Sequence, residues 1–114
     1  MAHPRSSHID EVLSSVRDPQ ASKRFMQARR TLQEHLVYTR EILNGKDFVF
    51  SGSEKVIHLA LHDLVDIEHR VGRFLLFDYA KVDEFYLLRI AGTEGFKDAI
   101  DTYFEEPEIR EKVD

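Results

Sequence analysis

The chain has 114 residues, of which 42% are hydrophobic and 32% are charged, and its formal net charge is −5. This length fits one domain with a hydrophobic core of its own, and the composition is too apolar for a disordered chain. The absence of cysteine excludes disulfide bonds, thiolate metal sites and a cysteine nucleophile. The first residues carry no apolar signal segment, and no apolar run approaches the roughly 20 residues that cross a bilayer. We therefore expect a cytoplasmic protein.

Charge is unevenly distributed along the chain. Residues 1–50 hold eight Lys or Arg against six Asp or Glu, a net +2, whereas residues 78–114 hold five against eleven, a net −6. Such asymmetry is typical either of a surface that faces a partner or of basic and acidic segments that lie side by side in one fold. An acidic molecule is a poor general binder of nucleic acid, because phosphate contact needs a clustered positive surface.

Two helices are predicted in the first part of the chain. A short helix over residues 8–17 begins with the Ser-x-x-Asp spacing of a capping box. Asp18 and Pro19 suit the N-cap and the first position of a second helix over residues 19–43. Its apolar positions recur on one side at helical spacing. They are Phe25, Ala28, Leu32, Leu36 and Leu43.

A stop and a connector follow this second helix. Asn44 and Gly45 are typical of a left-handed helix end. We interpret residues 46–50 as a connector whose Phe48 and Phe50 close the end of the core. A short strand is the alternative for this connector, although the sequence shows no partner strand.

Two further helices are predicted between residues 54 and 91. Ser51 and Glu54 have the spacing of a capping box and open a third helix. A break near Asp78 is expected to begin a fourth helix, and one long helix through residues 54–91 is the alternative. The expected apolar face of the fourth helix is Val82, Phe85, Tyr86 and Ile90.

A fifth helix is predicted after the turn at residues 92–95. It carries an i, i+3, i+4, i+7, i+8 apolar set and ends before Pro107. The set is Phe96, Ala99, Ile100, Tyr103 and Phe104.

These elements together predict an all-α fold. Residues 1–114 are expected to form a single helical domain, with residues 1–6 and 108–114 frayed. Helices joined by short loops, without strand periodicity, indicate a compact bundle of four main helices plus a short N-terminal helix.

The third predicted helix carries a strip of metal-ligand side chains: His58, His62, Asp66 and His69 follow i, i+4, i+8, i+11 spacing. Imidazoles one helical turn apart can share a divalent transition metal, and a carboxylate can complete or orient the site. The strip lies opposite the apolar face of its helix, and Lys55 beside it would repel a cation. A polar outer face and a histidine patch that faces a partner therefore stay open as alternatives.

The second predicted helix contains the main concentration of basic residues. Arg24, Arg29 and Arg30 could contact nucleic acid. Arg24 and Arg30 point about 120° apart on a helix, so these side chains form no single basic stripe. Nucleic-acid binding therefore ranks third among the functional hypotheses.

The segments around residues 76 and 87 hold more apolar side chains than one buried helix face requires. Leu76, Phe77, Leu87 and Leu88 are the surplus. In a small chain such a surplus is typical of a subunit interface, so we expect these residues to meet a partner in a homodimer.

The sequence favours a non-catalytic interaction or regulatory protein that acts as a homodimer. No nucleophile with a base, no acid–base pair and no cofactor-binding loop can be assigned. A metal-binding protein that uses the histidine strip is the second hypothesis. A separate protein partner stays open, and no membrane contact is expected.

Overall fold

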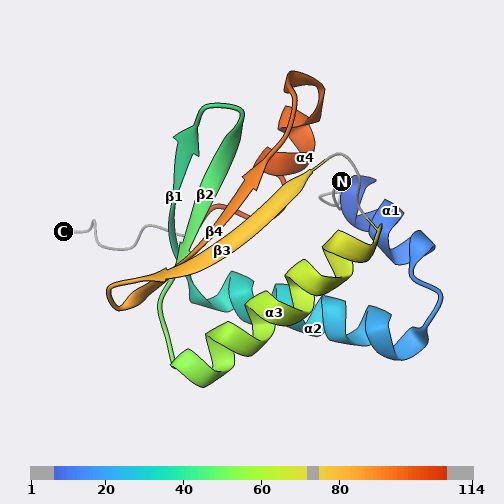
Figure 1. The fold of residues 1–114 in the computed structure, drawn as a ribbon, viewed down its shortest axis with the longest axis horizontal. Helices are drawn as coiled ribbons and strands as arrows, with labels where there is room; N and C mark the ends of the chain where they lie inside the picture. The colour runs from blue at the N-terminus through green and yellow to red at the C-terminus, as the bar shows by residue number, and fades with distance from the viewer. Residues whose placement is uncertain (1–6, 72–74, 108–114) are drawn as a thin grey trace.

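The computed structural model describes residues 7–71 and 75–107, shown as a ribbon in Figure 1. Its elements in chain order are α1 (Ser7–Ser15), α2 (Pro19–His35), β1 (Leu36–Ile42), β2 (Gly45–Phe50), α3 (Glu54–Val71), β3 (Leu76–Val82), β4 (Phe85–Ala91), the 3-10 helix η1 (Glu94–Phe96) and α4 (Lys97–Asp101). The expected fraying of residues 1–6 and 108–114 falls outside the described residues.

The predicted all-α bundle is wrong, because four segments form an antiparallel sheet. Two hairpins, β1–β2 and β3–β4, lie side by side in the strand order β1-β2-β4-β3. The fold is therefore a mixture of helices and sheet. Helices α2 and α3 lie against each other on one side of the sheet (Figure 1).

The first hairpin takes the place of the last part of the predicted second helix. Helix α2 ends at His35, and Leu36 is already extended with φ −70° and ψ 126°. The following residues are rich in β-branched and aromatic side chains, which favour a strand. Asn44 adopts a left-handed conformation with φ 64°, as predicted for a helix end, but here it closes a two-residue hairpin loop.

The second hairpin takes the place of the predicted fourth helix. Val82 pairs with Phe85 across a two-residue loop in which Asp83 has φ 58°. Asp78 lies within β3 and does not cap a helix. The third predicted helix is present as α3, whereas the fourth helix and the single long helix are wrong. Tyr86, Leu88 and Ile90 lie at alternate positions, which fits a strand with one face in the core.

Several helix boundaries agree with the sequence. Asp18 is the N-cap of α2, where its Oδ1 accepts a hydrogen bond from the Gln20 amide at 3.0 Å, and Pro19 follows at the first position. Helix α3 begins at Glu54 as predicted. Helix α4 is shorter than predicted and ends at Asp101, yet Tyr103 and Phe104 beyond it are buried in the core.

The hydrophobic core lies between the sheet and the helices. Strands β2 and β4 contribute Phe48, Phe50, Leu88 and Ile90, and the rings of Phe48 and Phe104 meet at 5.1 Å between centroids. Within residues 7–71 and 75–107, no helix is both long and apolar enough to span a bilayer.

Candidate functional site

The sheet has one face that the helices cover and one that they do not. Side chains alternate between the two faces along each strand. The face away from the helices, called here the open face, contributes no residue to the core cluster of the described chain. Its residues are Tyr38, Arg40, Ile42, Gly45, Asp47, Val49, Leu76, Asp78, Ala80, Val82, Phe85, Leu87, Arg89 and Ala91.

The strand register arranges the open face in three rows that cross all four strands in the order β1, β2, β4, β3. The first apolar row is Ile42, Gly45, Ala91 and Leu76. The charge row is Arg40, Asp47, Arg89 and Asp78. The second apolar row is Tyr38, Val49, Leu87 and Ala80. A row of alternating charge thus lies between two apolar rows.

The charge row is held by a buried carboxylate. Asp47 is 0% exposed, and its oxygens accept hydrogen bonds from Arg40 Nη2 at 2.7 Å and from Arg89 Nε and Nη2 at 2.7 and 2.9 Å. The hydrogen bond from Arg89 holds the pKa of Asp47 below its usual value, against the opposing effect of burial. The same contacts raise the pKa of Arg89. Asp47 and Arg89 are therefore both ionised near neutral pH.

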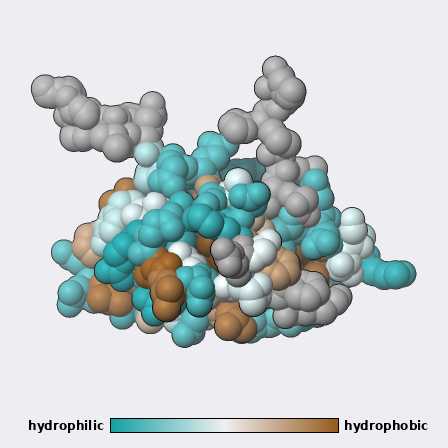
Figure 2. All heavy atoms as spheres, turned by 90° about the horizontal axis from the view of Figure 1, so that it is seen from above, coloured by the Kyte–Doolittle hydropathy of each residue, from teal (hydrophilic) through white to brown (hydrophobic). Residues whose placement is uncertain are grey.

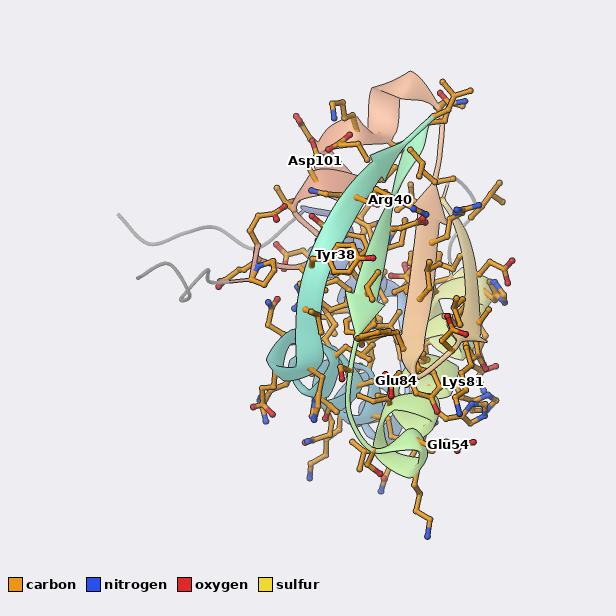
Figure 3. All side chains as sticks on the ribbon, turned by 90° about the vertical axis from the view of Figure 1, so that its left-hand side faces the viewer. Tyr38, Arg40, Glu54, Lys81, Glu84 and Asp101 are labelled. Carbon is orange, nitrogen blue, oxygen red and sulfur yellow. The ribbon has the colours of Figure 1, made fainter. Side chains whose placement is uncertain are left out.

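The apolar rows are partly open to solvent. Leu76 is 73% exposed and Tyr38 is 50% exposed, while Val49 between the inner strands is only 5% exposed. Figure 3 shows Tyr38 and Arg40 extending from β1 toward β2. Val82 and Phe85 continue the apolar surface at the end of the second hairpin, where both are exposed.

The surface seen from above (Figure 2) differs in character from the open face. Seen from above, the molecule shows mostly hydrophilic residues with hydrophobic ones scattered among them (Figure 2). Single exposed apolar residues are ordinary on a protein surface, whereas adjoining rows of them indicate a contact surface.

The predicted histidine strip lies on α3, where His58 and His62 line one shallow pocket but Asp66 and His69 have partners elsewhere. The ring of His58 meets the ring of Tyr79 at 6.0 Å between centroids, and His69 Nε2 lies 3.2 Å from the Phe77 carbonyl oxygen. Asp66 pairs with Arg70 at 2.9 Å. In the part of the chain that the structure describes, no group of three or more histidine or acidic side chains is placed to hold a metal ion. The geometry therefore gives the metal hypothesis no support.

The four residues predicted to face a partner divide between the two faces of the sheet. Leu76 and Leu87 lie on the open face. Phe77 and Leu88 point to the other side and belong to the core. Of these four residues, only Leu76 and Leu87 can meet a partner at the open face, because a strand sends successive side chains to opposite faces.

The basic residues of α2 also have separate environments. Arg29 lies against the aromatic residues after α4: its guanidinium is 5.6 Å from the Tyr103 ring centroid, and Nη2 donates to the Tyr103 carbonyl oxygen. Arg24 lines a groove between α2 and α3, and Arg30 is exposed. Arg29 therefore packs against the core, and only Arg24 and Arg30 of the three predicted arginines could contact nucleic acid.

A buried polar cluster connects three parts of the chain. Glu68 of α3 is 1% exposed, and its carboxylate accepts hydrogen bonds from the Tyr103 hydroxyl at 2.6 Å and from His8 Nε2 at 3.0 Å. Burial, followed by the charge of Glu68, raises the pKa of Tyr103 well above its usual value. Tyr103 is thus a neutral hydrogen-bond donor at physiological pH, and the cluster holds α1 and the segment after α4 against α3.

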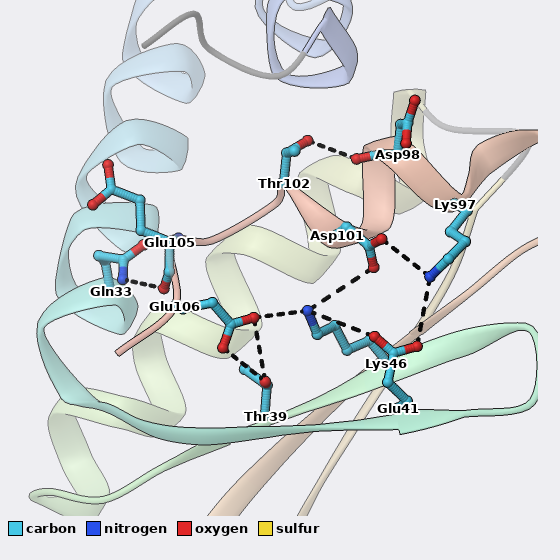
Figure 4. A network of polar contacts seen from close by, with 10 residues as sticks. All are labelled: Gln33, Thr39, Glu41, Lys46, Lys97, Asp98, Asp101, Thr102, Glu105 and Glu106. Carbon is cyan, nitrogen blue, oxygen red and sulfur yellow. Dashed lines mark hydrogen bonds and ion pairs between the residues drawn. The ribbon is translucent and has the colours of Figure 1, made fainter. Parts of the chain in front are cut away.

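A second polar cluster attaches the segment after α4 to the first hairpin (Figure 4). The buried Lys46 pairs with Glu106 at 2.8 Å and with Asp101 at 3.9 Å. Thr39 donates to Glu106 at 3.1 Å. The hydrogen bond from Lys46 lowers the pKa of Glu106. Both clusters join elements within the chain, and sequence spacing gave no signal for either.

The open face is the feature of the described chain that bears on function. The adjoining apolar rows and the charge row between them make the open face the candidate functional site. Comparisons with protein-family models, with curated proteins and with solved structures gave no match.

Proposed function

We propose that this chain is a non-catalytic interaction protein that acts as a homodimer and binds its second copy through the open face. The observation that carries the proposal is the pair of apolar rows on a sheet face that no described helix covers. Antiparallel sheets with one bare face commonly carry polar side chains there. Here Tyr38, Leu76, Leu87 and their neighbours give that face the apolar character of a contact surface.

The polar groups of the open face favour binding over catalysis. A general base must be free to accept a proton near the working pH. Asp47 accepts three hydrogen bonds from two arginines and has a lowered pKa, so it is a poor proton acceptor. The same arginines are already occupied in part by Asp47, which suits charge pairing across an interface better than chemistry on a small substrate.

The open face is small for a protein–protein interface. The face is four strands wide, at about 4.8 Å per strand, and about six residues long, which gives a projected area of roughly 400 Å². A standard stable interface buries about 800 Å² per partner. We therefore expect a weak dimer with a dissociation constant in the micromolar range, which needs concentrated protein to be seen. We place this dimer in the cytoplasm as part of the proposal, because the chain contains no cysteine.

The proposal is tested by sedimentation equilibrium of the full chain and of two matched variants. The wild type should rise from 13.4 kDa toward twice that mass as its concentration increases through the micromolar range. Leu76→Lys places a charge in the first apolar row and should weaken association at least about tenfold, because an unpaired ammonium would be desolvated.

Leu59→Lys is the matched control. Leu59 is 59% exposed, against 73% for Leu76, but it lies on α3, on the helical side of the molecule. This variant should associate like the wild type. A wild type that stays monomeric at several hundred micromolar, or a Leu76→Lys variant that associates normally, would overturn the proposal.

A further inference from the structure

The charges on the open face change sign from each strand to the next. Across β1, β2, β4 and β3 the row runs Arg40, Asp47, Arg89, Asp78, that is, positive, negative, positive, negative. Reading the row from the opposite edge gives the opposite sequence of signs. The row is therefore complementary to its own reverse and not to itself.

Two kinds of twofold axis can bring two open faces together. An axis parallel to the strands reverses the strand order, so β1 faces β3 of the second copy and β2 faces β4. An axis along the charge row keeps the order, so each strand faces its own counterpart. A twofold dimer uses the same surface on both copies, so that surface must be complementary to itself about the twofold axis.

Only the first arrangement pairs the charges. With the axis parallel to the strands, Arg40 faces Asp78 of the second copy and Asp47 faces Arg89. With the axis along the row, every charge faces an identical charge, which costs free energy in a partly desolvated interface. Exposure agrees with this arrangement, because Arg40 and Asp78 at the two edges are both open to solvent.

The apolar rows also match in the first arrangement, because each row then faces the same row of the second copy. Tyr38, the largest side chain of the second apolar row, faces Ala80, the smallest one. Ile42 faces Leu76 in the first apolar row. Only the pair of Tyr38 and Ala80 sets a large side chain against a small one, whereas Ile42 and Leu76 form an apolar contact between two large side chains at each edge. Sheets that pack in this aligned way lie about 10 Å apart, with their strands within about 30° of each other.

We infer that two copies of this chain dock face to face about a twofold axis parallel to the strands, with Arg40 of each copy paired to Asp78 of the other. The inference rests on the proposed homodimer and adds its geometry. The surface that each copy recognises is the open face of the other copy, on which the charge row runs in the reverse strand order.

Charge exchange at the two edges tests this geometry. Asp78→Lys and Arg40→Glu each place like charges opposite one another, and each should weaken self-association about tenfold in sedimentation equilibrium at low salt. The double variant, Arg40→Glu with Asp78→Lys, restores opposite charges at both contacts and should return to within about threefold of the wild type. An equimolar mixture of the two single variants should form a heterodimer for the same reason.

Glu84→Lys is the matched control, because it makes the same change of charge in the same hairpin but lies in the β3–β4 turn, outside the charge row. It should associate like the wild type. Circular dichroism checks that Arg40→Glu, which removes one hydrogen bond to Asp47, remains folded. If Arg40→Glu unfolds, the comparison of Asp78→Lys with Glu84→Lys is sufficient to test the direction of the twofold axis.

The possible results separate the geometry from the proposed function. With the axis along the charge row, each exchange would leave identical charges opposed as before, so neither the single variants nor the double variant would differ from the wild type. That result, together with a weakened Leu76→Lys variant, would overturn the inferred axis and leave the homodimer in place. A monomeric wild type would overturn both.

Discussion

Two buried tyrosine hydroxyls have opposite surroundings. The hydroxyl of Tyr103 donates to the buried Glu68 carboxylate at 2.6 Å. The hydroxyl of Tyr86 is also buried, but within the described residues it has no hydrogen-bond partner. A satisfied polar group contributes to stability, whereas an unsatisfied one costs free energy. Removing the hydroxyl from Tyr103 and from Tyr86 therefore makes the same chemical change in two different environments.

We expect Tyr103→Phe to lower the free energy of unfolding by about 1–3 kcal/mol, because it removes a donor from a buried charged carboxylate. Tyr86→Phe should change it by less than about 0.5 kcal/mol or raise it. Urea denaturation followed by circular dichroism measures both. Equal losses in the two variants would contradict a stabilising role for the bond to Glu68.

The sequence revealed part of this residue-scale picture. Tyr103 was predicted as an apolar core residue from its spacing, and its ring is buried. Its bond to Glu68 could not be predicted, because the two residues are 35 positions apart and meet only in the folded chain. The burial of Glu68 was hidden for the same reason.

The two hairpins are the segments in which the sequence predicts helices and the structure has strands. Leu36 and Leu43 satisfy helical spacing, so the periodicity of α2 continued formally into β1. Val37, Tyr38 and Thr39 favour a strand, but this preference gains strength only when β2 supplies a partner strand. Helix starts were predictable because caps act over three or four residues, whereas strand pairing acts over distances that spacing rules do not reach.

The turn of the first hairpin gives a prediction at the scale of the element. Asn44 has φ 64°, a conformation that costs most side chains about 1–2 kcal/mol and glycine almost nothing. Asn44→Ala should therefore lower the free energy of unfolding by about 1 kcal/mol. Asn44→Gly should leave it nearly unchanged. Thermal denaturation distinguishes the two variants, and an Ala variant as stable as the Gly variant would exclude a left-handed turn.

The charge row gives the whole molecule a pH dependence. The pKa of Asp47 is lowered in the folded state, so its stabilisation is present above the unfolded pKa, near 3.8, and is lost as the pH falls through the folded pKa. Arg89 is the largest cause of this lowering. The contribution of the Arg89 contact to stability must therefore decline in acid.

We expect Arg89→Gln to lower the free energy of unfolding at pH 7, where the ionised Asp47 loses a charged hydrogen-bond donor. The difference between wild type and variant should shrink as the pH falls below about 3.8, because Asp47 is then neutral in the unfolded chain and loses its charge in the folded one. Urea titrations between pH 3 and pH 7 measure this. A difference that stays constant over that range would show that Arg89 acts through packing alone.

The candidate site was predictable in its apolar part and not in its charged part. Leu76 and Leu87 stood out in the sequence as surplus apolar residues, and both lie on the open face. Asp47 and Arg89 gave no signal, because they are 42 residues apart and become neighbours only through the pairing of β2 with β4. A row that crosses four strands exists only in the assembled sheet.

The buried carboxylate also restricts how the hairpins can pair during folding. A slip of two residues would keep the same side chains on each face, so burial of apolar groups alone discriminates weakly against it. After such a slip Asp47 would stand beside Tyr38 or Ile42 on one strand and Leu87 or Ala91 on the other, and its charge would lose both guanidinium donors. Misaligned pairings are thereby penalised, so this one aspartate contributes to the alignment of β1, β2 and β4.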